Sequence, residues 1–131
     1  MNQMFRETAC NMFDVYYILW KANNVTSLYA AFWGCTKCVT DINNPLRRDV
    51  FKKCGNVTNT EYLFYNTNIG GPLYSPSHNG DTITAYDGLF SYLKKVQLIN
   101  YMFLTNRTFY IDDLLFYKCS DSQSLPITQM Y

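Results

Sequence analysis

The sequence predicts an all-β domain, a sandwich or a closed barrel, with a short helix at its start. Tyrosine, phenylalanine and tryptophan make up 18% of the chain, and aromatic residues favour pleated, half-buried surfaces. Short apolar runs alternate with turn clusters about every 8 to 12 residues, which is typical of sandwiches and barrels. Several runs are apolar on both faces, so the sheet must close on itself or carry a second layer. A length of 131 residues fits one domain, spanning residues 1–131.

The first elements are expected to be a helix and a hairpin. Apolar residues at steps of three or four predict an amphipathic helical lead-in over residues 1–13. Residues 14–21 are rich in β-branched and aromatic side chains and predict a strand. A second strand is expected at 28–33. The two strands would form a hairpin with its tip at residues 23–27.

The later strands are shorter and separated by polar segments. The polar stretch 41–59 is expected to be a long loop or a short helix. Residues 98–104 and 109–117 would form a hairpin. We identify no internal repeat or low-complexity tract. The remaining strands are expected, in chain order, at residues 60–66, 73–74, 82–86, 98–104 and 109–117.

Cysteines and glycosylation sequons predict a secreted, extracellular glycoprotein. An odd number of cysteines in a short chain fits an oxidising compartment but leaves one thiol without an intramolecular partner. Cys35 and Cys38 are spaced as in a zinc knuckle or a redox pair, although disulfide bonding is the favoured interpretation. Asn-x-Thr sequons begin at Asn24, Asn56 and Asn106, each where a turn is expected. The disulfide candidates are Cys10, Cys35, Cys38, Cys54 and Cys119.

The sequence gives little support to catalysis or to binding of nucleic acids or membranes. The net charge is +1, too small to attract a polyanion over a distance. No apolar run approaches the roughly 20 residues needed to cross a bilayer, and the N-terminus does not resemble a signal peptide. His78 lies in a turn without an oriented partner. We therefore expect neither an enzyme, nor a cofactor, nor a metal site, nor a nucleic-acid partner.

Two groups of charged residues have competing interpretations. The basic cluster in the 41–59 segment is offset by two aspartates, so a solvated loop face is favoured over a phosphate-binding track. Asp112 and Asp113 interrupt an apolar strand. They either mark a bend with both carboxylates in water, or place one carboxylate inward for a cationic ligand. The basic cluster and its offsetting acids are Arg47, Arg48, Lys52, Lys53, Asp41 and Asp49.

In order and spacing, four segments resemble successive strands of tick salivary lipocalins, a group that includes histamine-binding proteins. The segments are residues 14–21, 33–39, 61–68 and 109–119. The resemblance implies an eight-stranded antiparallel up-and-down lipocalin barrel over residues 14–119, with a shortened C-terminal tail at 120–131. Trp20 does not sit in the family's usual Gly-x-Trp motif, and the family's C-terminal helix and late cysteines are shortened or missing.

The resemblance also implies a function in host immunity. A secreted lipocalin would hold a small hydrophobic ligand, such as a sterol, fatty acid or eicosanoid, and modulate host immune or inflammatory responses. Its further expected partner is a host immune cell or protein. The alternatives are a scavenger of a biogenic amine such as histamine and a secreted β-sandwich interaction module without a cavity. The oligomeric state stays open. The expected ligand-binding residues are Trp20, Trp33, Tyr62, Phe64, Tyr101, Phe103, Phe109, Ile111 and Leu115.

Overall fold

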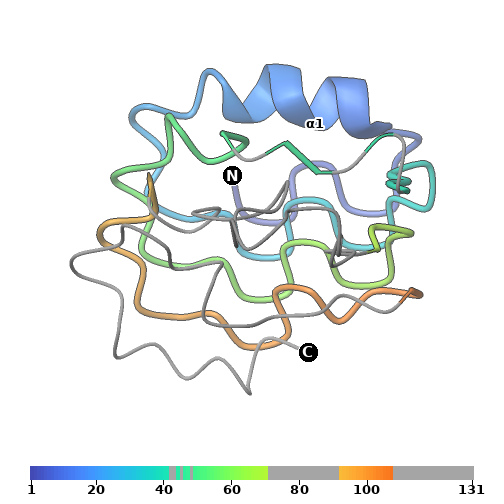
Figure 1. Ribbon diagram of the computed structural model, residues 1–131. Coiled ribbons are helices and arrows are strands. Elements are labelled where there is room, and N and C mark those ends of the chain that lie inside the picture. Colours follow the sequence, from blue (N-terminus) through green and yellow to red (C-terminus); the bar gives the residue numbers. More distant parts are fainter. Residues whose placement is uncertain (42–43, 45, 48, 71–91, 108–131) are drawn as a thin grey trace, which may run out of the picture.

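The described part of the chain is a stack of extended segments with one helix packed along its side (Figure 1). The computed structural model describes residues 1–41, 44, 46–47, 49–70 and 92–107. Within these residues there is one α-helix, α1 (Met12–Leu19). Pairing of β type is limited there to three isolated parallel bridges, which join Ser27 to Asn59, Asn59 to Leu98, and Val39 to Asn68.

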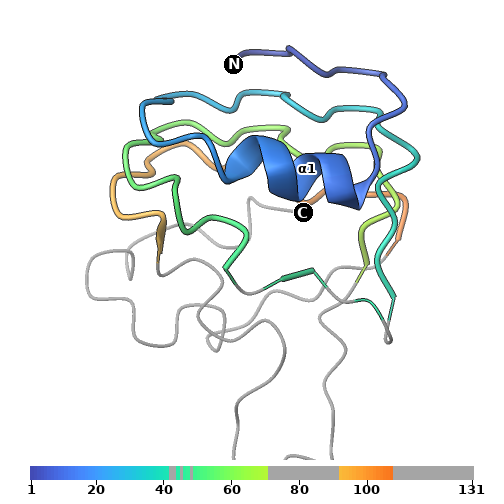
Figure 2. The same ribbon diagram turned by 90° about the horizontal axis from the view of Figure 1, so that it is seen from above.

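Four segments run side by side and follow one another in chain order (Figures 1 and 2). We call residues 1–10, 27–38, 59–69 and 98–107 the first to fourth stacked segments. Alternate backbone amides of each segment donate to carbonyls of the next one, as when Ala30 donates to Glu61 at 2.9 Å. The same alternation joins the first segment to the second and the third to the fourth.

The intervening amides close tight turns within each segment. Ala31 N–H, for example, donates to the carbonyl of Leu28 at 3.1 Å, which makes Ala30 the third residue of that turn. Such turns often need a left-handed backbone at their third residue, and positive φ angles recur at equivalent positions. Because every second amide is used inside its own segment, a continuous sheet ladder does not form. The left-handed residues in these segments are Gln3, Glu7, Ala30, Gly34, Tyr62, Asn66 and Tyr101.

The predicted antiparallel lipocalin barrel is wrong for the described residues. The segment expected as strand 28–33 lies parallel to residues 60–65 instead of forming a hairpin with 14–21. Residues 98–104 lie parallel to the third segment. The linkers between these segments are long enough to return the chain to the same side of the stack, and this allows parallel pairing. The expected strands 73–74, 82–86 and 109–117, and the tail 120–131, lie outside the described residues.

The N-terminal prediction also needs correction, because the helix is displaced along the chain. Residues 1–10 form the first stacked segment, and α1 covers most of the stretch that we expected to be a strand. A capping box starts α1: Asn11 Oδ1 accepts from Asp14 N–H, and Asp14 Oδ2 accepts from Asn11 N–H, both at 3.0 Å. Val15 and Leu19 lie one turn apart and are fully buried, so packing overrides their neighbours' preference for strands.

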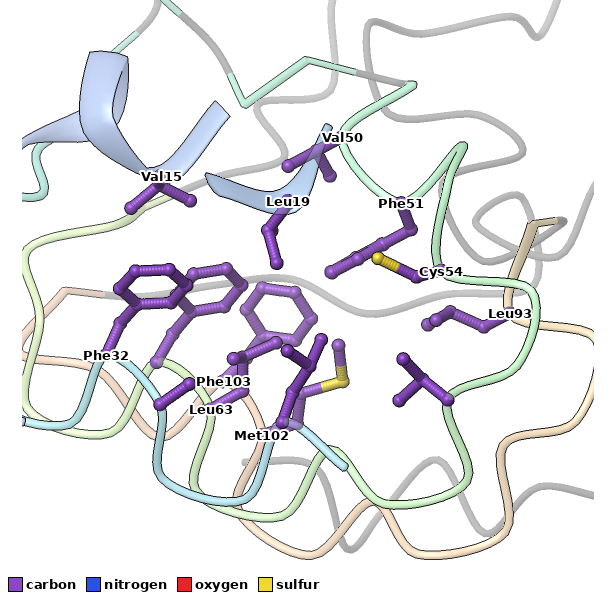
Figure 3. Packing of buried hydrophobic residues seen from close by; sticks show 14 of the residues in the cluster. Val15, Leu19, Phe32, Val50, Phe51, Cys54, Leu63, Leu93, Met102 and Phe103 are labelled. Atoms are coloured by element: carbon purple, nitrogen blue, oxygen red, sulfur yellow. The ribbon is translucent and has the colours of Figure 1, made fainter. Parts of the chain in front are cut away.

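A column of phenylalanine rings fills the space behind the stack. Consecutive centroids in the column lie 5.7, 6.0 and 5.4 Å apart, and a buried ring of this size contributes up to about 3 kcal/mol. Val15 and Leu19 of α1 point toward the column from one side, together with Phe51 of the segment 46–57 (Figure 3). The phenylalanine column consists of Phe5, Phe32, Phe64 and Phe103.

The stack reveals an internal repeat that our sequence analysis missed. The Asn-Val-Thr triplets that start at Asn24 and Asn56 precede the second and third segments at equivalent positions. The side chains there join neighbouring turns: Asn56 Nδ2 donates to the carbonyl of Asn23 at 2.8 Å, and Lys95 Nζ donates to Asn56 Oδ1 at 3.0 Å. Insertions of unequal length separate the repeats, so no fixed period marks them.

The first segment leaves one row of acceptors unused. Its amides donate to the second segment, but the carbonyl oxygens of Asn2, Met4 and Arg6 accept no hydrogen bond within the described part of the chain. In the second segment, the corresponding carbonyls of Tyr29 and Ala31 each accept from the first. Within the described part of the chain the stack therefore has a direction, and the row of backbone groups left unpaired at its N-terminal end consists of carbonyl acceptors.

Candidate binding face

Five aromatic side chains gather on the side of the stack that faces away from the phenylalanine column. Tyr101 is 42% exposed, and the other four are half-buried. They come from the second, third and fourth segments, so residues far apart in sequence meet on one surface. We call this set, Tyr29, Trp33, Tyr62, Tyr65 and Tyr101, the aromatic face.

Tyr62 is the centre of the aromatic face. Its ring centroid lies 5.1 Å from that of Trp33 and 5.4 Å from that of Tyr101. The rings of Tyr29 and Tyr65 meet it edge-on, at 5.9 and 5.6 Å. Such offset and edge-to-face contacts are favourable beyond the area they bury. The rings therefore hold one another in place before any partner arrives.

Charged and aromatic neighbours crowd the ring of Trp33. The guanidinium of Arg6 in the first segment lies 4.2 Å from the ring centroid, a cation–π contact. The ring of Tyr65 in the third segment lies at 4.3 Å, centroid to centroid, and is tilted by 45°. Leu104, 39% exposed, occupies the equivalent position in the fourth segment. Contacts from both neighbouring segments thus restrict access to the indole ring.

The electrostatics of the face favour neutral phenols. Crowding by its neighbours removes water from Tyr62 and raises the pKa of its hydroxyl, and the nearby phenols of Tyr101 and Tyr29 act in the same direction. The Tyr62 hydroxyl is thus protonated at neutral pH and can donate and accept hydrogen bonds. Glu61 and Arg6 supply one charge of each sign beside the rings.

The structure distributes the expected ligand-binding residues over several places. Trp33, Tyr62 and Tyr101 come together, but on the outer aromatic face. Phe64 and Phe103 are buried within the phenylalanine column. Trp20 is the C-cap of α1. The other three, with His78, Asp112 and Asp113, lie outside the described residues; they are Phe109, Ile111 and Leu115.

Sequence reasoning missed Tyr29, Tyr65 and Arg6 as members or neighbours of the face. The available signal was positional. Trp33 and Tyr65 each follow directly after a phenylalanine of the column, so a residue in that place alternates to the outside. Without the repeat alignment, this shared position is not visible.

Cys10, Cys35 and Cys38 lie close together where the first and second segments meet. Cys35 Sγ lies 2.9 Å from the carbonyl oxygen of Phe5, and Cys38 Sγ lies 3.2 Å from that of Cys10. Contact between the two thiols lowers the pKa of Cys35 and raises that of Cys38. Cys54, which lies in the phenylalanine-column core instead of this group, is also buried, and burial raises its pKa to about 12.

The four described cysteines are free thiols, and Cys119 lies outside the described residues. Disulfide pairing therefore stays a prediction of the sequence. Among the residues that the structure describes, no cluster of three or more metal-ligating side chains has a geometry that could hold a metal ion.

Comparisons with known proteins leave the chain without a family assignment: no family model, curated protein or solved structure matches it. The described residues also contain no helix long and apolar enough for a bilayer crossing. The function must therefore be argued from the geometry of the chain itself.

Proposed function

We propose that this chain is a non-catalytic binding module that recognises another protein through its aromatic face. Tyrosine, tryptophan and arginine are the residues that dominate binding energy at protein interfaces. Here five such rings and Arg6 form one continuous surface. This clustering on an outer surface is the observation that carries the proposal.

The arrangement of the rings favours a protein over a stacked planar ligand or a sugar. A sugar ring would pack on an open aromatic face, whereas Arg6, Tyr62 and Tyr65 already lie against the ring of Trp33. The edges and hydroxyl groups that remain suit a surface with mixed apolar and hydrogen-bonding groups. Because the rings are already ordered, binding costs little side-chain entropy.

The proposal departs from the expected lipocalin function in its site. A barrel interior was expected to hold the ligand, and the described residues form no barrel. The proposed partner contacts the outside of the stack, as in the expected alternative of a surface-acting module. Secretion and a role in host immunity stay predictions of the sequence. Asn24, Asn56 and Asn106 are exposed, so glycosidase treatment of the protein from its native source would test secretion.

A displayed library of random peptides tests the proposed face. Binders selected against the whole chain should lose about tenfold or more in affinity for Tyr101→Ala, because truncating an aromatic side chain that is a binding hot spot costs about 2 kcal/mol or more. The control is Val39→Ala, which truncates a side chain of similar exposure, 48%, that belongs neither to the aromatic face nor to α1. A selection in which no binder loses affinity for Tyr101→Ala or Tyr62→Ala would overturn the proposal.

A further inference from the structure

The outer side of α1 carries an unusually apolar stripe for an exposed surface. Phe13, Tyr17 and Trp20 are 76%, 59% and 47% exposed. They lie at positions i, i+4 and i+7 of the helix, so they share one face. The opposite face buries Val15 and Leu19 in the core. α1 therefore has a second apolar side that the described residues leave open to solvent.

A pocket of about 340 Å³ adjoins this stripe, between α1 and the start of the segment 46–57. It is large enough to admit one aromatic or large aliphatic side chain of a partner. Its lining includes one carboxylate, that of Asp49, and one guanidinium, that of Arg47. The residues lining the pocket are Phe13, Tyr16, Tyr17, Trp20, Arg47, Asp49 and Val50.

Cations surround the stripe and are held on its rings. Lys52 and Lys53 place their ammonium groups 5.7 and 5.3 Å from the ring centroid of Trp20. Lys21 donates to the hydroxyl of Tyr17 at 2.7 Å. Arg47 lies 4.4 Å from the centroid of Tyr16. Four positive side chains thus border the stripe and its pocket.

We infer that this surface, the helix patch (Phe13, Tyr17 and Trp20 with Lys21, Arg47, Lys52 and Lys53), binds an acidic peptide segment that carries a large apolar side chain. The apolar residue would enter the pocket against Trp20, and flanking carboxylates would pair with Lys52, Lys53 and Arg47. The charge of the rim supplies the complementarity, and the exposed stripe marks an interaction site. A concave pocket favours an inserted side chain over a flat bilayer surface.

This inference goes beyond the proposed function, because it concerns a second surface formed by different residues. Substitutions in the aromatic face and in the helix patch can therefore fail independently. The sequence alone favoured a solvated loop for the basic cluster, since the exposed aromatics that complete the patch come from α1, which was expected to be a strand.

The test uses the full chain with Trp33→Phe, which leaves Trp20 as its single fluorescent indole. The probe is a synthetic peptide of repeating Glu-Glu-Leu-Phe, and its binding should shift the emission of Trp20. At low salt, Lys52→Glu combined with Lys53→Glu should weaken binding about tenfold or more, because two attractions become repulsions. Lys94→Glu with Lys95→Glu reverses another adjacent lysine pair, which does not belong to the helix patch, and should change affinity less than about twofold.

Two further peptides test whether the helix patch requires both the apolar and the acidic residues of its partner. A peptide with Ala in place of Leu and Phe, and one with Lys in place of Glu, should both bind at least about tenfold more weakly. Equal binding of either one would overturn the inference. So would binding to vesicles of phosphatidylserine and phosphatidylcholine without binding to the acidic peptide, because the patch would then recognise a membrane surface.

Discussion

At the scale of single residues, the turns of the stack decide which side chains are tolerated. Glu7, Gly34 and Asn66 share one left-handed position in successive segments, with φ between 57° and 73°. Asparagine and glycine adopt this conformation most readily. Gly34 has a second reason to lack a side chain, since a Cβ there would lie 2.8 Å from Cγ of Glu7.

Gly34→Ala should therefore lower the free energy of unfolding by about 1–3 kcal/mol, through backbone strain and the clash with Glu7. Urea denaturation of the two proteins measures the difference. Gly55→Ala is the matched control, because its Cβ would meet ordinary space and its φ is not positive. It should be neutral or stabilise by up to about 1 kcal/mol. Equal effects at both positions would contradict the assigned turn geometry.

At the scale of elements, α1 shows where prediction from sequence worked and where it did not. A short N-terminal helix was expected over residues 1–13, whereas α1 covers residues 12–19. The β-branched and aromatic run after Asp14 suggested a strand by composition. The decisive signals were Asn11 and Asp14, which form the cap, and the spacing of Val15 and Leu19. Periodicity and capping outweigh composition here because the helix buries only one face.

Asn11→Ala should destabilise the protein by about 1 kcal/mol, since it leaves the amide of Asp14 without its acceptor. Asn11→Ser keeps a good N-cap and should cost much less. Thermal unfolding followed by circular dichroism measures both. A loss of equal size for serine and alanine would show that the Asn11 side chain acts through something other than the cap.

At the scale of the whole molecule, the sequence predicted many of the segments but not their pairing. Residues 28–33, 60–66 and 98–104 were expected to be strands rich in apolar residues. Each is part of a stacked segment and carries a phenylalanine of the column, but tight turns replace the expected strands. Their parallel stacking was not predicted, since unequal insertions hide the repeat. Three of the aromatic-face residues were named as ligand contacts, because large rings suit any binding surface, but their outward direction depends on the stacking.

Within the phenylalanine column, we expect the stability of the stack to depend most on the inner ring of Phe64. Phe64 contacts both Phe32 and Phe103, so Phe64→Ala should cost about 3–5 kcal/mol. Because that loss could unfold a small domain, Phe64→Leu provides a milder test, with an expected cost below about 2 kcal/mol. Phe13→Ala, on the exposed side of α1, should stay within about 0.5 kcal/mol of the parent. Chemical denaturation of the three variants ranks them.

The carbonyls of Asn2, Met4 and Arg6, which accept no hydrogen bond from the described residues, set a rule for association between the N-terminal ends of two stacks. Two molecules that approach through their N-terminal ends would bring oxygen lone pairs against oxygen lone pairs, with no proton between them. The N-terminal end of one stack therefore does not pair with the same end of another. This lowers the tendency to aggregate that unpaired backbone edges otherwise have. Its complement is a strand edge that presents amide protons at every second residue.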